Sequence, residues 1–322
     1  MGWPTSGITE MFNVLHAFFV APFANMWEFP VFLVEVVANG LLTGVMYSLV
    51  ALGFVLIFKA SGIFNFAQGV MVLFAALTLV GLMEHGVPVW LAMILTIAVM
   101  IVLAFVIERL MLRPLVNQEH IILFMATIGL TFFLEGFGEL LWGSNVKRLD
   151  IGIPEDPIEI KGVLLNKFDL IAAAVGAVVV GVLAVFFHKT TIGRALRAVA
   201  DDHQAALSVG IPLKTIWVVV WSVAGIVAMV AGIMWGGKSG VQFSLSLIAL
   251  KALPVLILGG FTSVPGAIVG GLIIGVGEKV AEVYWGPLFG GAIENWFAYV
   301  LALVFLLFRP QGLFGERIIE RV

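Results

Sequence analysis

The sequence predicts an all-α, polytopic membrane protein, and three observations support that prediction. Hydrophobic residues make up 61% of the 322 residues and charged residues only 11%, where a soluble domain carries about 25% charged residues. Apolar runs of about 20 residues, the length that crosses a bilayer, recur along the chain. Because backbone polar groups in lipid must bond within their own segment, we expect these runs to be helices.

The spans are expected at the longest apolar runs, which give about 8–10 transmembrane helices. The first run is longer than one crossing requires and the seventh and eighth are short, so each can be divided differently. Leu253-Pro254 and residues 259–266 interrupt the short runs and predict broken helices whose free backbone groups face protein or a cavity. In a nine-span division the runs are residues 31–58, 64–82, 88–107, 121–141, 168–187, 213–235, 249–259, 266–277 and 293–308.

Residues 1–30 are expected to be a variable N-terminal extension of a membrane domain at residues 31–322. No Lys or Arg precedes the apolar stretch at residues 11–23, which argues against a secretory signal peptide. We expect this stretch to lie at the membrane interface or to span.

Basic residues predict the orientation, because Lys and Arg collect in cytoplasmic loops. The loop at residues 188–212 and the C-terminus are therefore expected to be cytoplasmic, and the loop at residues 143–167 external. Basic residues on the opposite side oppose this assignment: Lys147, Arg148, Lys161, Lys167, Lys238 and Lys279. The first four lie in the external loop, where acidic residues balance them, which weakens the objection without removing it. The side of the N-terminus stays open. The basic residues on the predicted cytoplasmic side are Lys59, Arg109, Arg113, Lys189, Arg194, Arg197, Lys214, Arg309, Arg317 and Arg321.

Small residues line one face of the first span and one face of the eighth. Small residues let two helix backbones approach closely in a membrane, so we expect both faces to pack in a tight bundle. The residues are Gly40, Gly44 and Ser48 in the first span, and Ala267, Gly271 and Gly275 in the eighth.

Glu35, Asn39 and Thr43 follow one another at intervals of four residues and form a polar stripe in the first span. Such a stripe faces a bundle interior or a water-filled cavity, because exposing a carboxylate to lipid is costly. Asn39 and Thr43 are therefore candidate pathway residues. The alternative places Glu35 at the outer interface, with Asn39 and Thr43 bonding a neighbouring helix.

Two amides lie at the start of the second span. Asn65 can cap the helix, and Gln68, three residues on, can reach back as in a capping box. The alternative is that this helix start points into a translocation route, where its N–H groups and positive dipole end contact a polar substrate group. Under that interpretation Asn65, Gln68 and Gly69 are pathway residues.

Few other charges lie inside the predicted spans. Glu135 is the best candidate for the buried carboxylate that a proton-coupled carrier would need, whereas a position at the outer interface explains Glu139. Lys251, at the start of a short span, is expected to be an interfacial anchor or the partner of a carboxylate.

The loop at residues 191–212 is predicted to be a short amphipathic helix in water. Its alanines favour helix, Arg197 and Asp201 can pair at a spacing of four, and Gly210 followed by Pro212 ends the helix. An exposed apolar face beside these charges predicts that another protein docks here; the alternative is a helix on the membrane surface. That face comprises Leu196, Val199, Ala200 and Leu207.

Composition argues against several other classes of protein. The net charge of -3 and the lack of a basic patch argue against nucleic acid binding. The chain has no cysteine and its five histidines are scattered, so neither a metal site nor a cluster of catalytic residues is expected. The sequence has no G-x-x-x-x-G-K-[ST] phosphate loop, so this chain is not expected to hydrolyse ATP.

Several segments resemble LivH-type permeases of bacterial ABC importers for branched-chain amino acids, and the similarity extends over most of the chain after residue 30. The segments are residues 40–54 (GLLTGVMYSLVALGF), 65–69 (NFAQG), 194–211, 256–267 (LILGGFTSVPGA) and 308–314 (FRPQGLF).

The resemblance implies an inner-membrane permease subunit that is not an enzyme and binds no cofactor itself. It would pair with a second permease of LivM type, with two cytoplasmic ATPase subunits of LivG and LivF types that bind ATP, and with a periplasmic binding protein. Whether the permease pair is hetero- or homodimeric stays open. Leucine, isoleucine and valine are the expected solutes. Urea, short amides or other small organic solutes are alternatives, as is an ion-coupled secondary carrier. The loop would dock on an ATPase through Arg194, Arg197, Asp201, Asp202, Ala205 and Gly210.

Overall fold

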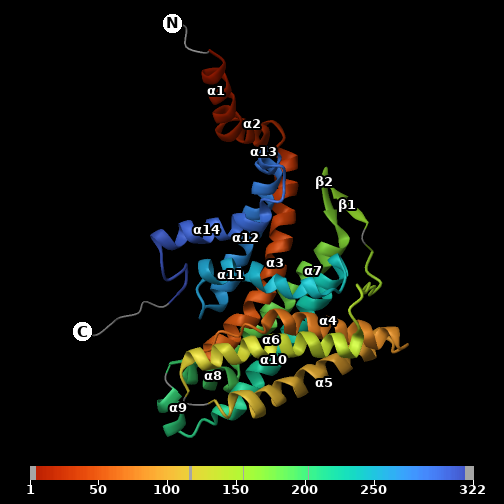
Figure 1. Ribbon diagram of the computed structural model, residues 1–322, viewed down its shortest axis with the longest axis vertical. Coiled ribbons are helices and arrows are strands. Elements are labelled where there is room, and N and C mark those ends of the chain that lie inside the picture. The colour runs from red at the N-terminus through yellow and green to blue at the C-terminus, as the bar shows by residue number, and fades with distance from the viewer. Residues whose placement is uncertain (1–4, 116–117, 155, 202, 316–322) are drawn as a thin grey trace, which may run out of the picture.

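The computed structural model describes residues 5–115, 118–154, 156–201 and 203–315, and nearly all of its regular structure is helical (Figure 1). The first helices are α1 (Thr5–Phe19), α2 (Ala21–Glu28), α3 (Pro30–Ser61), α4 (Gln68–Glu84), α5 (Val89–Ile107), which continues through a π-helical turn (Glu108–Leu112), and α6 (His120–Trp142). A hairpin of β1 (Pro157–Ile160) and β2 (Val163–Asn166) is followed by α7 (Lys167–Lys189), α8 (Thr191–Asp201), α9 (His203–Ser208) and α10 (Leu213–Ser239). A 3-10 turn (Phe243–Leu247) leads into α11 (Ile248–Gly259), and then come α12 (Val264–Tyr284), α13 (Gly286–Phe289) and α14 (Glu294–Phe308).

Each predicted span corresponds to a helix of the structure. In the described part of the chain six helices are long and apolar enough to cross a membrane: Pro30–Ser61, Val89–Leu112, Ile121–Trp142, Lys167–Phe187, Leu213–Ser239 and Val264–Tyr284. Shorter apolar helices, Gln68–Glu84, Phe243–Gly259 and Glu294–Phe308, lie at the remaining predicted positions. The prediction of an all-α, polytopic membrane protein is confirmed, apart from the short hairpin, and the long first run is one helix of 32 residues.

The small-residue faces of α3 and α12 pack against each other. A Cβ at Gly271 would lie 2.1 Å from Ser48 Oγ, and one at Gly275 would lie 2.5 Å from the carbonyl oxygen of Gly40. Only residues without larger side chains permit two backbones to approach this closely. Because α3 also contacts α7, α10 and α11, it is the central helix of the bundle, and the predicted tight packing is confirmed.

Helix α11 passes through a proline without breaking. Pro254 has no N–H, so the carbonyl of Leu250 loses its helical partner. Tyr299 of α14 donates a hydrogen bond of 2.7 Å to that carbonyl instead. The predicted break at Leu253-Pro254 is therefore wrong. The interruption lies at the turn after α11, where Gly260 has a positive φ of 101°.

One end of the bundle, called here the hairpin end, carries the loop at residues 143–167. Strands β1 and β2 pair in antiparallel register from Pro157↔Asn166 to Ile160↔Val163. The carboxylate of Glu35, near the start of α3, accepts a hydrogen bond of 2.9 Å from the backbone N–H of Leu164. The loop is thereby fixed to the central helix.

The opposite end, called here the α8 end, gathers the end of α3, helix α8, the turn between α11 and α12, and the C-terminal segment. Trp217 Nε1 of α10 donates to the carbonyl of Ala60 at 3.3 Å. The backbone N–H of Leu313 donates to the carbonyl of Leu258 at 2.8 Å. The loops predicted on opposite sides of the membrane therefore lie at opposite ends.

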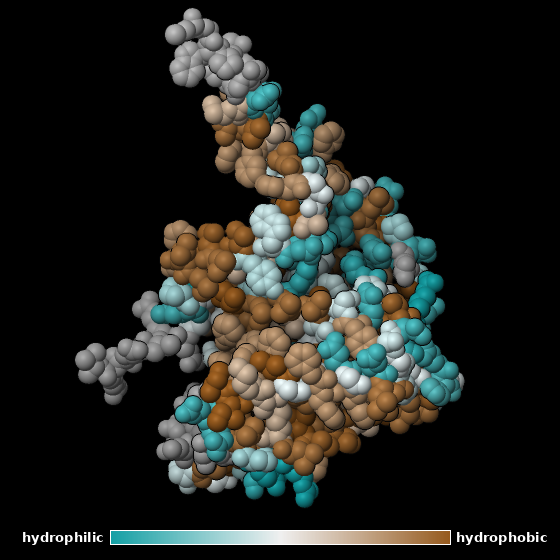
Figure 2. Space-filling view, viewed as in Figure 1, coloured by the Kyte–Doolittle hydropathy of each residue, from teal (hydrophilic) through white to brown (hydrophobic). Residues whose placement is uncertain are grey.

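The sides of the bundle are apolar. Figure 2 shows broad hydrophobic surface over α14 and over the lower helices α5 and α6, while hydrophilic residues gather beside the hairpin. Phe132 is 71% exposed and Leu307 83%. Apolar surface of this extent is expected where lipid is the solvent.

Residues 5–28 of the expected N-terminal extension form α1 and α2, which protrude from the bundle beside α13 (Figure 1). Trp285 Nε1 donates to the carbonyl of Phe18 at 3.1 Å, and the rings of Phe23 and Trp285 lie 5.7 Å apart. These contacts attach both helices to the start of α13.

Candidate functional site

An apolar cavity of about 170 Å³ with one carboxylate in its wall lies between α3, α4, α6 and α11, and we call it the Glu135 cavity. Gly69 lets the start of α4 approach the 3-10 turn that forms part of the wall, because a Cβ at this position would lie 2.1 Å from the carbonyl oxygen of Ser246. The hydroxyl of Thr127 in α6 accepts the backbone N–H of Phe66 at 3.1 Å and fixes the loop before α4. The residues that line it include Phe54, Phe64, Phe66, Gly69, Glu135 and Ser246.

Asn65 and Gln68 are fully buried and bind each other rather than lining this cavity. Asn65 Nδ2 donates to Gln68 Oε1 at 3.4 Å, and Asn65 Oδ1 accepts the N–H of Ala67 at 3.1 Å. Helix α4 begins at Gln68 with Ala67 as its N-cap, so the predicted capping box is wrong. The capping box does not form because the Asn65 side chain accepts the N–H of Ala67, two residues on, and so closes a turn that precedes the helix. Of the three candidate pathway residues in this segment, Gly69 alone lines the Glu135 cavity.

The polar stripe of α3 lies elsewhere. Glu35 is bound to the hairpin, in agreement with the alternative that placed it at the outer interface. Asn39 is half-buried and Thr43 is buried, and neither side chain makes a hydrogen bond with any described residue. The bonding of Asn39 and Thr43 to a neighbouring helix, expected under that same alternative, is not found among the described residues.

Three polar side chains meet inside the bundle at the junction of α3, α11 and α12, and we call them the Glu278 cluster. Tyr47 donates a hydrogen bond of 2.7 Å to the Glu278 carboxylate, which is 1% exposed. Lys251 Nζ lies 3.7 Å from the other carboxylate oxygen, so the prediction that Lys251 is the partner of a carboxylate is confirmed. The ring of Tyr47 stacks on Trp235 at 5.3 Å.

Sequence reasoning did not assign a role to Tyr47 or Glu278, although a signal was present. Tyr47 follows Gly44 by three residues and Glu278 follows Gly275 by three. Each therefore continues the small-residue face of its helix. In the structure the two faces pack with opposite chain directions, Gly40 against Gly275 and Gly44 against Gly271. The pattern therefore places both side chains along the contact of α3 with α12, but it does not show that they reach each other.

The predicted amphipathic helix at the α8 end corresponds to α8 and α9, which lie on either side of residue 202, outside the described residues. Leu196 is 2% exposed and Val199 is fully buried, so the expected exposed apolar face is wrong at these positions: they pack into the core of the bundle itself. Leu207 remains 53% exposed and Val209 is 75% exposed. Gly210, with a φ of 83°, follows the end of α9, as predicted.

The candidate coupling residues have different environments. Arg194 is exposed, whereas Arg197 Nη1 donates a hydrogen bond of 2.6 Å to the carbonyl of Phe187. Asp202 lies outside the described residues, and so do the side chains of Asp201 and Ala205. The predicted pair of Arg197 with Asp201 therefore stays a prediction.

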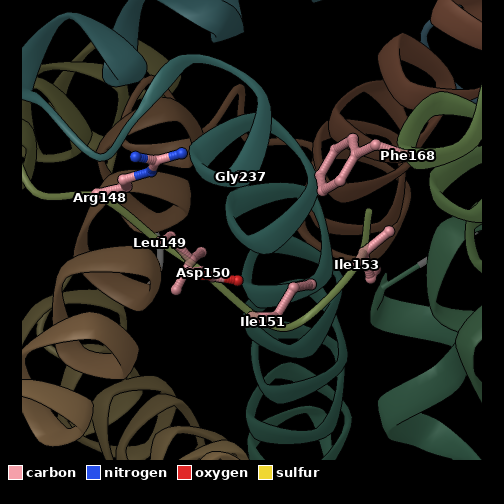
Figure 3. A pocket seen from close by; sticks show the side chains of 7 residues that line it. All are labelled: Arg148, Leu149, Asp150, Ile151, Ile153, Phe168 and Gly237. Atoms are coloured by element: carbon pink, nitrogen blue, oxygen red, sulfur yellow. The ribbon is translucent and has the colours of Figure 1, made fainter. Parts of the chain in front are cut away.

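A second cavity, of about 260 Å³, lies at the hairpin end (Figure 3). The loop at residues 143–167 supplies Arg148 and Asp150, and the ring of Phe168 closes the cavity against Gly237, where a Cβ would lie 2.6 Å from Phe168 Cζ. Its two charges have opposite signs. It contains none of the candidate pathway residues.

Comparison with known proteins identifies the family. Residues 36–309 match the family described as "Branched-chain amino acid transport system / permease component". The chain is 30% identical to the high-affinity branched-chain amino acid transport system permease protein BraD of Pseudomonas aeruginosa, over 88% of this chain and 96% of that protein. The corresponding permease LivH of Escherichia coli K12 is 27% identical, with the same coverage of both chains. A probable branched-chain amino acid transport permease protein LivH of Methanocaldococcus jannaschii is 26% identical over 83% of this chain and 88% of that protein. The chain belongs to this family of permease components of branched-chain amino acid transport systems.

Proposed function

We propose that this permease subunit passes leucine, isoleucine and valine across the inner membrane, and that the Glu135 cavity is part of their route. The names of the relatives support the class of solute. The observation behind the route is the single carboxylate in a wall that is otherwise largely apolar and aromatic. A branched-chain amino acid presents an ammonium group and an aliphatic side chain, which such a wall binds at a carboxylate and at aromatic rings respectively.

The cost of a carboxylate within a membrane supports a role for Glu135. Intramembrane carboxylates face a bundle interior or an aqueous route and are expensive elsewhere. Glu135 is half-buried and lines the cavity. Two other carboxylates toward the hairpin end have different environments, since Glu35 binds the hairpin and Glu139 is exposed. Asn39 and Thr43 remain candidates for a further part of the route along α3.

The cavity opens on a side of the bundle that we assign to a second permease subunit, of LivM type. Phe66 is 37% exposed and Leu247 57% at its rim. Lipid can cover these apolar groups, but a carboxylate in the wall of an open cavity is costly against lipid and favours a protein cover. That partner would complete the wall opposite Glu135.

The α8 end is assigned to the cytoplasm and to the ATPase subunits, of LivG and LivF types, which would bind the ATP. Basic residues concentrate at this end, as in cytoplasmic loops. Arg194 is exposed and has no partner among the described residues, and Val209 is exposed close by in sequence. The C-terminus would then be cytoplasmic, and the hairpin end would face the periplasmic binding protein.

Uptake of labelled leucine by the complete transporter in proteoliposomes tests the route. Glu135→Gln is expected to lower ATP-dependent uptake about tenfold, the effect of losing a charge-assisted hydrogen bond of about 1.5 kcal/mol. Glu139→Gln, on the same helix but exposed, is the matched control and is expected to transport normally. Normal uptake by Glu135→Gln would contradict the route. ATP-independent uptake by this chain alone would contradict the assignment to an ATP-driven importer.

Co-purification of the ATPase subunits tests the docking end. Arg194→Glu is expected to lower the amount of ATPase recovered with the permease, because it reverses an exposed charge at the proposed contact. Arg148→Glu makes the same change on an exposed residue of the hairpin end and is expected to have no effect. Equal recovery with both variants would contradict the assignment of the α8 end.

A further inference from the structure

A third cavity, which has no role in the proposed transport route, lies at the α8 end, and we call it the Lys59 cavity. It has a volume of about 280 Å³ and lies between the last turns of α3 and α7, the middle of α8 and the start of α12. Residues that line it include Leu56, Lys59, Phe187, Arg197, Ile268 and Phe314.

Its polarity changes with depth in the membrane. Along α3, Leu56 lies one turn deeper in the bundle than Lys59, and along α12, Ile268 lies deeper than Ser263 at the helix start. The basic and hydroxyl groups therefore lie toward the end of the bundle and the apolar groups toward its middle. A molecule with a polar head and an apolar tail matches this order.

The charges in the cavity are positive. Lys59 is half-buried and has no hydrogen-bond or ion-pair partner among the described residues. Arg197, the second cation, is held over the cavity by its hydrogen bond to the Phe187 carbonyl. None of the described residues in the wall is acidic. A half-buried ammonium group without a carboxylate is costly unless an anion outside this part of the chain balances it.

We propose that the Lys59 cavity binds an anionic phospholipid of the adjacent leaflet, with the headgroup phosphate between Lys59 and Arg197. An acyl chain would follow the apolar wall past Leu56 and Ile268 into the membrane. Basic pockets between transmembrane helices at the membrane surface are recognised sites for acidic headgroups. The apolar wall favours a lipid over free phosphate, which would use the basic groups and leave that wall empty.

This site would connect the lipid to transport. Arg197 belongs to α8, so a phosphate bound to it would hold α8 against the ends of α3 and α7. The surface of α8 that faces away from the bundle, with Arg194, would stay free for another protein.

Lipid retention measured by native mass spectrometry tests the proposal. The full chain, purified with the subunits that accompany it, is supplied with phosphatidylglycerol or with phosphatidylcholine. We expect bound phosphatidylglycerol on the native chain and about fivefold less on Lys59→Gln, which corresponds to about 1 kcal/mol for one basic side chain near an acidic headgroup. Lys189→Gln, an exposed lysine at the same end, is expected to retain the lipid, and Lys59→Arg, which keeps the charge, is expected to retain most of it.

Three results would overturn the proposal. The first is equal retention of phosphatidylglycerol by the native chain and by Lys59→Gln. The second is equal retention of phosphatidylcholine and phosphatidylglycerol by the native chain, since the headgroup charge would then be irrelevant. The third is displacement of the lipid by inorganic phosphate alone, which would identify a phosphate site without a lipid tail.

Discussion

The two ends of the bundle treat their basic residues differently. At the hairpin end most basic residues have carboxylate partners; Arg148 and Lys161, both exposed, have none among the described residues. At the α8 end most basic residues have no carboxylate partner in the described part of the chain. The hairpin-end pairs are Lys147–Glu84, Lys167–Asp156, Lys238–Asp169 and Lys279–Glu294. In the described part of the chain, the basic residues without a carboxylate partner at the α8 end are Lys59, Arg109, Lys189, Arg194, Lys214 and Arg309, whereas Arg113 pairs with Glu108 at 3.4 Å.

This difference indicates which end of the molecule binds anionic partners. At the hairpin end, carboxylates of the same chain balance most of the basic residues, so no external anion is needed there. Unbalanced cations at the α8 end attract anions from outside, either lipid headgroups or acidic groups of another protein. Of the lysines in the loop at residues 143–167, Lys147 pairs with Glu84 of α4, outside its own loop, and Lys167 pairs with Asp156 within it.

The largest expected effect concerns the packed small-residue faces of α3 and α12, called here the α3–α12 seam, which join the two ends. In Gly271→Ala the new Cβ would lie 2.7 Å from the carbonyl oxygen of Gly44, so α3 and α12 must separate. We expect a loss of about 3 kcal/mol of stability, at the upper end for overpacking, and a lower unfolding temperature in detergent. The control is Gly129→Ala on α6, where a Cβ meets nothing within 4 Å. This change is expected to stabilise slightly, because alanine favours helix. Similar unfolding temperatures would contradict the seam.

A smaller effect is expected from the pair of Lys251 with the buried Glu278, which lies midway between the ends. Lys251→Met leaves the Glu278 carboxylate with Tyr47 as its remaining partner, and we expect a loss of about 2 kcal/mol. That value lies below the cost of breaking a fully buried pair, because the Lys251 side chain is 23% exposed. Adding Glu278→Gln to Lys251→Met is expected to restore part of the stability. Strict additivity of the two changes in a double-mutant cycle would show that the groups are not coupled.

Much of this arrangement could be predicted from the sequence, and the missing parts have physical causes. Periodic apolar runs placed the spans, and glycine spacing located both faces of the α3–α12 seam, because both signals are local to one helix. The partner of Lys251 could not be identified, because contacts between distant segments depend on helix rotation. The apolar face of α8 was assigned to another protein for the same reason. The sequence shows that the face is hydrophobic, but it does not show whether Leu196 packs on its own bundle or on a partner. Asn65 and Gln68 were sound candidates for polarity in a span, but they bind each other, and the buried Gln68 Nε2 has no hydrogen-bond partner among the described residues.

The smallest expected effect separates the paired charges of one end from the unpaired charges of the other. Lys238 binds Asp169 at 2.7 Å, and both side chains are partly exposed. Surface pairs of this kind contribute about 0.2–1 kcal/mol, so Lys238→Gln is expected to lower the unfolding temperature slightly at low salt and not at high salt, where the pair is screened. Lys189→Gln makes the same change at the α8 end. Lys189 has no partner among the described residues, so this variant is expected to leave stability unaltered at either salt concentration. Equal destabilisation by the two variants would mean that the cations of the α8 end are also balanced from within the chain, and the contrast between the ends would be lost.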